Sequence, residues 1–165
     1  MSLRVLVIDD EPPARRKLKM MLGSEPDIEI VGEAANGLDA ISAIETHKPD
    51  AIFLDIQMPG MNGFEVLDAL SPESLPLVVF VTAYDQHAVK AFDVHAVDYL
   101  LKPFDRARLQ SCLTRLRSDR VALSSQLKEL LAEFRTREYL ARVAVKSHGK
   151  VLFVKTNEEI GRAHV

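Results

Sequence analysis

Short apolar runs alternate with longer amphipathic stretches along the first hundred residues of the chain. Five runs rich in Val, Ile and Leu predict β-strands at residues 3–8, 28–34, 51–54, 77–81 and 97–101. Helices are predicted between them: Pro12 and Pro13 open the first, which Gly23 closes, and Asn36 caps the second. Buried strands that alternate with amphipathic helices predict an α/β fold, a doubly wound five-stranded parallel sheet covered on both faces. Ligands of such sheets bind at the carboxyl ends of the strands.

A different pattern follows, because no proline or glycine interrupts residues 105–135. This segment predicts one long C-terminal helix of about 45 Å, at roughly 1.5 Å per residue. Eight positions along this helix are spaced alternately by four and three residues, which places them in one stripe, as in a heptad repeat with one polar member. They are Leu109, Leu113, Leu116, Arg120, Leu123, Leu127, Leu130 and Phe134. The stripe either packs on its own domain or pairs with a second copy. A five-unit sheet is too short to cover all of it, so we favour a dimerising linker in which Arg120 helps to set the register.

Two further β-type runs follow the long helix. Residues 140–146 and 151–155 are joined by Ser-His-Gly-Lys at 147–150, which predicts a β-hairpin. Two strands are rarely stable alone, so we expect this hairpin to be the first piece of a second, truncated domain. Residues 160–165, with Glu159 before them, match what a widely used short-read sequencing adapter encodes in one frame. We therefore expect them to be a non-native read-through tail.

Composition places the chain among ordinary globular proteins. Of its 165 residues, 47% are hydrophobic and 27% are charged, which is typical of a packed core, and the length suits one domain with an appendage. The formal charge of −3 argues against a wholly basic nucleic-acid binder. No apolar run approaches the roughly 20 residues that span a bilayer, so we expect a cytoplasmic protein with no membrane partner. Cys112, the single cysteine, is expected to fill space in the long helix.

Three aspartates lie at the ends of two predicted strands, Asp9 and Asp10 after the first and Asp55 after the third. In a parallel sheet these ends can adjoin. Carboxylates that pack together repel one another unless a cation joins them. Hard oxygen ligands suit Mg²⁺, or alternatively Mn²⁺, better than zinc. Each aspartate alone would be read as a solvated acid, but the set predicts a divalent-cation site.

The same edge of the sheet gains a hydroxyl and a positive charge, because Thr82 ends the fourth predicted strand and Lys102 ends the fifth. Both groups suit the oxygens of a phosphoryl group. A carboxylate such as Asp55 can attack phosphorus to form an acyl phosphate while neighbouring positive charge stabilises the transferred oxygens. No glycine-rich nucleotide loop follows the first strand, so a nucleotide cofactor is not supported.

Four sequence blocks resemble the signature of response-regulator receiver domains. They read VIDDE at 7–11, FLDIQMPGMNG at 53–63, VTAY at 81–84 and DYLLKP at 98–103. The resemblance covers residues 1–120 and implies a flavodoxin-like, CheY-like sheet with its strands in the order 2-1-3-4-5. It also implies a two-component signalling protein that receives a phosphoryl group from a sensor histidine kinase. Such a domain is not an enzyme beyond its self-catalysed phosphorylation and slow dephosphorylation.

The resemblance assigns roles to individual residues of the acidic site. It implies that Asp55 is the phosphoacceptor, and that Asp10, Asp55 and the main-chain carbonyl of Gln57 hold Mg²⁺. Asp9 would support the metal through water. Gln57 and Tyr84 flank the site and are expected to tune the lifetime of the phosphoryl group.

The resemblance also implies a conformational switch. Thr82 and Lys102 would bind the phosphoryl group, and Thr82 would move inward with Tyr99 following it. This movement changes the face formed by the fourth helix, the fifth strand and the fifth helix. Pro103 would follow a cis peptide bond.

Residues 143–154 resemble the opening of LytTR-type DNA-binding domains. The two resemblances divide the chain into a receiver domain (1–120), a helical linker (121–138), the start of a truncated DNA-binding domain (139–159) and the suspected tail (160–165). They imply control of transcription, with DNA contacted only through the missing part of the second domain. We expect a homodimer, formed through the switch face or through the 105–135 helix.

Two other functions remain open. A phosphatase of the haloacid-dehalogenase type also uses an aspartyl phosphate and Mg²⁺, but it needs a second aspartate two residues after the nucleophile, where Gln57 stands here. A receiver-like interaction module that never takes up phosphate would not need the three aspartates, the threonine and the lysine. All five are present.

Overall fold

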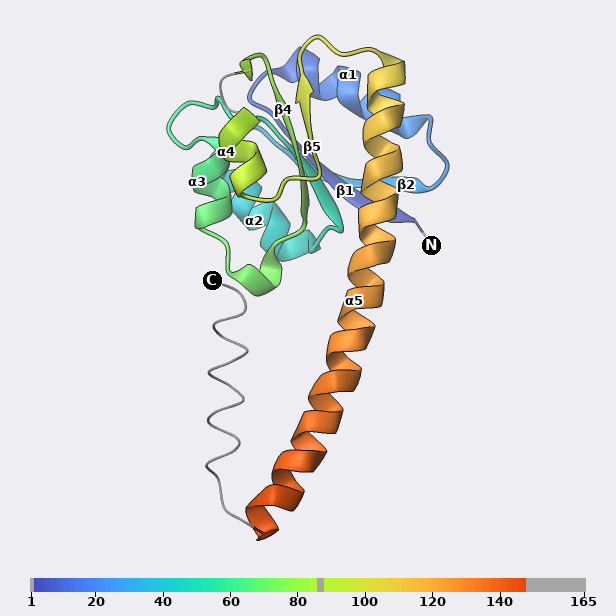
Figure 1. Ribbon diagram of the computed structural model, residues 1–165. Helices are drawn as coiled ribbons and strands as arrows, with labels where there is room; N and C mark the ends of the chain where they lie inside the picture. Colours follow the sequence, from blue (N-terminus) through green and yellow to red (C-terminus); the bar gives the residue numbers. More distant parts are fainter. Residues whose placement is uncertain (1, 86–87, 148–165) are drawn as a thin grey trace. The chain divides into compact units, whose positions relative to one another are not determined.

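The computed structural model describes residues 2–85 and 88–147, and the chain divides into two compact units after Arg120. A five-stranded sheet forms the centre of the first unit, with the strands in the order β2-β1-β3-β4-β5 (Figure 1). Every neighbouring pair is parallel. The strands are β1 (Leu3–Ile8), β2 (Ile28–Ala34), β3 (Ala51–Leu54), β4 (Leu77–Thr82) and β5 (Asp98–Leu101). The predicted doubly wound parallel sheet and its strand order are therefore confirmed.

Helices cover both faces of the sheet. They are α1 (Pro12–Gly23), α2 (Gly37–His47), α3 (Gly63–Asp68), α4 (Ala88–Asp93) and α5 (Arg106–Ser147), with a short 3₁₀ turn at Pro72–Ser74. Side chains of α1 and of the first turns of α5 pack on one face, and side chains of α2, α3 and α4 pack on the other. Each crossover between parallel strands thus returns over one face or the other, as the alternating pattern predicts.

Helices α2 and α3 begin at asparagines that bind free backbone N–H groups. The side chain of Asn36 accepts a hydrogen bond from the N–H of Asp39 at the start of α2. At the start of α3, Asn62 and Glu65 form a reciprocal capping box. Gly63 follows directly, and a Cβ there would lie only 2.7 Å from the carbonyl oxygen of Asp55. The glycine therefore lets α3 begin close against the end of β3.

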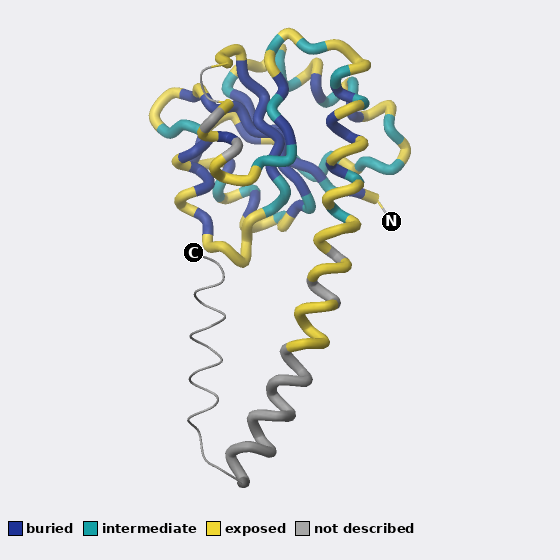
Figure 2. The backbone as a smooth tube through the Cα atoms, viewed as in Figure 1, coloured by how far each residue is buried: buried dark blue, intermediate teal, exposed yellow. Residues whose placement is uncertain are grey.

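Strand side chains alternate between two apolar clusters, one on each face of the sheet. The central strands are coloured as buried in Figure 2. Leu6, Ile52 and Phe80 contribute to the cluster beneath α2, α3 and α4. Val7 and Leu100 contribute to the cluster beneath α1 and α5. Burial on both faces explains why the strands read as nearly continuous apolar runs.

The first turns of α5 belong to the core of the first unit. Leu109, Leu113 and Leu116 of the predicted stripe are fully buried, and so is Cys112, as expected for a small apolar filler. The guanidinium of Arg120 donates a hydrogen bond to the Ser2 carbonyl of the same chain, and its expected role in the register of two paired helices stays a prediction. The early part of the stripe therefore packs on its own domain.

The later turns of α5 extend beyond the helix predicted for residues 105–135. Helix α5 continues to Ser147, so the predicted strand at 140–146 is wrong, and the predicted strand at 151–155 lies outside the described residues. A helix satisfies its backbone hydrogen bonds within one segment, whereas a strand needs a partner. Apolar side chains on the turns after Arg120 are exposed, among them Val121, Leu123, Leu130 and Leu131. Within residues 2–85 and 88–147, no helix is both long and apolar enough to cross a membrane.

Replacing Leu113 by Ala tests the packing of α5 on the sheet. The side chain is fully buried, so its loss is expected to lower the free energy of unfolding by about 2–5 kcal/mol. Thr114→Ala, at the next and exposed position, is expected to change it by no more than about 0.5 kcal/mol. Urea denaturation measures both values, and equal losses would contradict the packing of this face.

Candidate functional site

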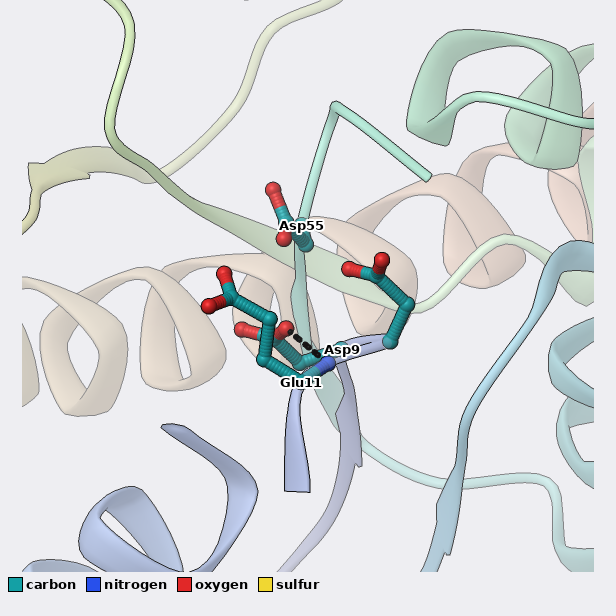
Figure 3. Close-up of side chains that lie close together, drawn as sticks. Asp9, Glu11 and Asp55 are labelled. Carbon is teal, nitrogen blue, oxygen red and sulfur yellow. Dashed lines mark hydrogen bonds between the residues drawn. The ribbon is translucent and has the colours of Figure 1, made fainter. Parts of the chain in front are cut away.

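Acidic side chains converge where β1 and β3 end. The two strands are neighbours, Ile8 pairs with Leu54, and the N–H of Asp55 donates to the carbonyl oxygen of Ile8 at 2.9 Å. The last pair of the ladder thus places Asp55 beside the residues that follow β1. One carboxylate oxygen from each of four residues, Asp9, Asp10, Glu11 and Asp55, lies within 4.8 Å of the others. Figure 3 shows the side chains of Asp9, Glu11 and Asp55 extending into the same space beyond the strand ends.

Short turns after each strand orient these carboxylates. Asp9 accepts a hydrogen bond from the N–H of Glu11 at 2.9 Å (Figure 3), and Asp55 accepts one from the N–H of Gln57 at 3.2 Å. In both turns an aspartate binds the backbone two residues further on, a local geometry that aspartate favours. The aspartates at 9 and 55 are buried, whereas Glu11 is exposed.

Lys102 supplies the positive charge of the site from the end of β5. Its ammonium nitrogen lies 2.6 Å from Asp9 Oδ2, 3.4 Å from Asp55 Oδ2 and 3.5 Å from Glu11 Oε1. The peptide bond between Lys102 and Pro103 is cis, as the receiver resemblance implies. Lys102 therefore contacts acids that belong to two different strands and balances part of their charge.

Burial raises the pKa of Asp55 from its ordinary value of 3.8 to about 7, and the negative charge of Asp9 adds to the increase. The ammonium of Lys102 and the N–H of Gln57 oppose this rise only in part. A further positive charge would favour the ionised carboxylate. The donors gathered here are all hard oxygens, the ligand type that Mg²⁺ and Mn²⁺ prefer. The residues present therefore fit a divalent cation.

Hydrogen bonds join Thr82, Tyr84 and Tyr99 where β4 and β5 lie side by side. Thr82 ends β4 and is fully buried, and its Oγ1 accepts a hydrogen bond from the N–H of Tyr84 at 3.4 Å. The hydroxyl of Tyr99 donates to the carbonyl oxygen of Tyr84. The N–H of Lys102 donates to the carbonyl of Thr82 at 2.7 Å. Backbone and side-chain contacts thus connect the ends of β4 and β5 at this edge of the sheet.

An open cavity of about 430 Å³ lies over the cluster. Its lining includes Asp10, Asp55, Gln57, Tyr84 and Lys102. The cavity therefore joins a carboxylate that can act as a nucleophile, a lysine that can bind an anion and acids that can hold a cation. This combination suits the transfer of a phosphoryl group to the carboxylate.

Sequence reasoning missed two acidic residues that the structure places in charged contacts. Glu11 joins the acidic cluster and approaches Lys102. Asp98, at the start of β5, is buried and pairs with Arg108 of α5. The signal for Asp98 was an acidic residue inside a predicted strand, which is rare unless the charge is paired.

Comparison with known proteins agrees with this geometry. Residues 5–114 match the family described as the response regulator receiver domain, and the chain belongs to this family. Receiver domains are phosphoacceptor signalling domains and not enzymes in the usual sense. They bind Mg²⁺ at an acidic pocket, and they normally interact with a sensor histidine kinase.

Individual relatives resemble the chain over most of its length. It is 44% identical over 156 residues to the transcriptional regulatory protein BtsR of Escherichia coli (strain K12), and 46% identical over 156 residues to an uncharacterised response regulatory protein of Yersinia pestis. Each match covers 94% of this chain and 63% of the relative, so the chain spans less than two thirds of their length. The response regulatory domain of mrkE from Klebsiella pneumoniae is similar in structure, with a TM-score of 0.66 and 33% identity over 73% of this chain and 99% of that one.

Replacing Asp55 by Asn tests the electrostatics of the site in metal-free protein. Between the ordinary pKa of 3.8 and the raised value of about 7, the folded protein keeps a proton that the unfolded chain releases, so rising pH costs stability. The uncharged variant avoids this cost. Asp55→Asn is expected to be more stable than the unaltered protein by on the order of 2 kcal/mol at about pH 8, and the difference should shrink as the pH falls toward 4.

Urea denaturation in the presence of a chelator, over a series of pH values, measures the difference. Added Mg²⁺ serves as the control, because it should stabilise the unaltered protein more than the Asn variant. Equal stability of the two proteins at every pH would contradict the unfavourable ionisation of Asp55.

Proposed function

We propose that this protein is the receiver part of a response regulator that controls transcription, and that Asp55 accepts a phosphoryl group from the phosphohistidine of a sensor kinase. The observation that carries the proposal is the position of Asp55 beside Lys102, with a nitrogen–oxygen distance of 3.4 Å, at a cavity lined by further acids. A buried carboxylate at an open cavity, with a lysine at hand, has the parts that an acyl phosphate requires.

The transfer proceeds by attack of an Asp55 oxygen on phosphorus while the phosphorus–nitrogen bond of the donor breaks. The electron pair of that bond stays with the histidine nitrogen. The ring leaves as a neutral imidazole because its other nitrogen carries a proton in the donor. Lys102 stabilises negative charge on the transferred oxygens, and the Thr82 hydroxyl donates to one of them.

Asp10, Asp55 and the carbonyl of Gln57 would hold Mg²⁺, with Asp9 supporting it through water. When bound, the cation supplies positive charge that offsets repulsion between the carboxylate and the incoming phosphoryl group. Asp9 also keeps the Lys102 ammonium in place through its contact of 2.6 Å. The chain's own acids thereby position both positive charges of the site.

Thr82 and Tyr99 form the switch in this proposal. The Tyr99 hydroxyl is bonded to the carbonyl of Tyr84, two residues after Thr82. When Thr82 turns toward the phosphoryl group, this contact links its segment to β5 and to the face formed by α4, β5 and α5. The readout of phosphorylation is a change of that face.

Output through DNA is supported by the relatives. BtsR carries the name of a transcriptional regulatory protein, and this chain spans 63% of it. We assign to the remainder a LytTR-type DNA-binding domain, on the resemblance of residues 143–154. Because residues up to Ser147 are helical here, that resemblance rests on sequence alone, and the boundaries 1–120, 121–138 and 139–159 are part of the proposal.

A homodimer through α5 is also part of the proposal. Leu123 and Leu130 lie one heptad apart on the predicted stripe and are 44% and 58% exposed. Apolar side chains at this spacing on a helix suit an identical stripe on a second copy, which would remove them from water.

Intact mass after incubation with acetyl phosphate and Mg²⁺ tests the phosphorylation. We expect a gain of about 80 Da that requires both the metal and the aspartate. Asp55→Asn, or removal of the metal with a chelator, should abolish it, while Asp39→Asn, at an exposed position of α2, should not. The absence of added mass in folded protein, together with no binding of beryllofluoride, would contradict the proposal and favour an interaction module.

Placing charge on the stripe tests the dimer. The double variant Leu123→Glu/Leu130→Glu is expected to weaken self-association by more than about tenfold, because two charges would have to be buried. Ser125→Glu/Ala132→Glu is the matched control, with the same charge and spacing on the opposite side of the helix. Sedimentation velocity over a range of concentrations measures both. Equal weakening by the two variants would show that the stripe is not the interface.

A further inference from the structure

A buried carboxylate joins the edge strand to the long helix, away from the acidic cluster. Asp98 begins β5, and its side chain is only 4% exposed. Arg108, in the first turn of α5, donates to it from both terminal nitrogens, at 2.6 and 2.8 Å. Arg115, two turns further along the helix, lies 3.1 Å from the same carboxylate. Two arginines of α5 thus pair with the charge at the start of β5.

The same pair of side chains holds the backbone of Tyr99. The N–H of Tyr99 donates to Asp98 Oδ1 at 2.7 Å, and Arg108 donates to the Tyr99 carbonyl at 3.2 Å. Side chains alternate along a strand, so Asp98 faces α5 while Tyr99 packs against the cluster under α2, α3 and α4. The hydroxyl at the far end of Tyr99 binds the carbonyl of Tyr84. Tyr99 is therefore attached to α5 at its backbone and to the β4 loop at its ring.

The strand between this pair and the functional site is short. Only Leu100, which is fully buried, and Leu101 separate Tyr99 from Lys102. The ammonium of Lys102 contacts Asp9 and lies 3.4 Å from Asp55. Because close-packed interiors transmit strain, we expect a displacement at one end of this four-residue strand to displace the other end as well.

The pair stays ionised in the folded protein. Burial alone would raise the pKa of Asp98, but the two guanidinium groups and the Tyr99 N–H outweigh it, so the pKa lies below its ordinary value. Bidentate contact between a guanidinium and a carboxylate fixes direction as well as distance. The side chain of Asp105 accepts a hydrogen bond from the backbone N–H of Arg108 at 2.8 Å, which fixes the turn of α5 that carries Arg108.

We propose that Asp98 and Arg108 are positioning residues that couple Tyr99 to helix α5, so that a change at Asp55 reaches the helix through β5. The inference rests on the proposed phosphorylation of Asp55. A shift of the Tyr99 peptide must either carry the start of α5 with it or break contacts to a buried charge. Coupling between two sites needs a structural element whose conformation depends on both of them. Here that element is β5 together with the Asp98–Arg108 ion pair, which lies between Asp55 and α5.

A second ion pair on the same helix provides an internal control. Arg117 also donates twice to one carboxylate, that of Asp27, at 2.7 and 2.8 Å. Asp27 lies just before β2, on the opposite edge of the sheet from β5. The two pairs match in chemistry and in their attachment to α5, although Asp27 is more exposed than Asp98. Among the described hydrogen bonds, those to the Tyr99 backbone come from the first pair.

Hydrogen exchange of the full chain, with and without beryllofluoride and Mg²⁺, tests the proposal. Fluorine NMR of the bound beryllofluoride measures loading of Asp55 separately. In the unaltered protein, loading is expected to change exchange at residues 106–120. Arg108→Gln should load within about twofold of the unaltered protein yet show a change in that segment smaller by about fivefold or more. Arg117→Gln should load and respond as the unaltered protein does.

Two further variants keep the outcome decisive. Arg108→Lys retains the charge but loses the second contact, so it is expected to restore part of the response. Asp98→Asn keeps the shape of the side chain and repeats the test if Arg108→Gln does not fold. Arg115 still faces Asp98 when Arg108 is replaced, which favours folding of that variant.

The possible results distinguish the coupling role of the ion pair from the proposed phosphorylation of Asp55. A full response in both Arg108→Gln and Asp98→Asn, or an equal loss in Arg117→Gln, would overturn the coupling role of the pair. Loading of the unaltered protein with no change at residues 106–120 would overturn it as well. Failure of the unaltered protein to bind beryllofluoride would instead overturn the proposed function, and the coupling with it.

Discussion

Repulsion between carboxylates at one edge of the sheet is the constraint on which the site depends. Parallel strands place the residues after β1 and β3 side by side, and four acidic side chains meet there. Lys102 offsets part of this charge through its contacts with Asp9 and Asp55, yet the pKa of Asp55 remains raised to about 7. An edge with surplus negative charge suits a divalent cation, whose positive charge would favour the phosphoryl group of the proposed function.

Strand β5 connects this edge to the rest of the molecule. Its last residue leads into Lys102 at the site, and its first, Asp98, is bound by two arginines of α5. Tyr99 between them touches the β4 loop through its hydroxyl. One edge strand of four residues thus contacts the site, the loop after β4 and the long helix. Any signal that leaves the site toward α5 has a continuous covalent and ionic route through it.

The strands and the acidic site were predictable because local chemistry and topology agree there. Apolar runs bounded by turn residues define the strands, and a parallel sheet brings their carboxyl ends to one edge. The predictions failed where a long-range partner decides the outcome. The 140–146 run has β-type residues, but the structure extends α5 through it. The role of Arg120 in the register of two copies stays a prediction; within one chain, Ser2 and Asp50 bind its guanidinium.

The sequence by itself determined the sheet, its helices and the identity of the groups at the site, because periodicity and strand-end residues are properties of short segments. Only the tertiary structure decided which charges pair. The contacts of Asp98 with Arg108, and of Arg117 with Asp27, join residues from separate elements. Their partners are chosen by which side chains lie within reach after the sheet and α5 have packed. The face of the sheet to which a strand residue points follows from its place in the alternating pattern. Its distance from a charged side chain on another element does not follow from any local pattern.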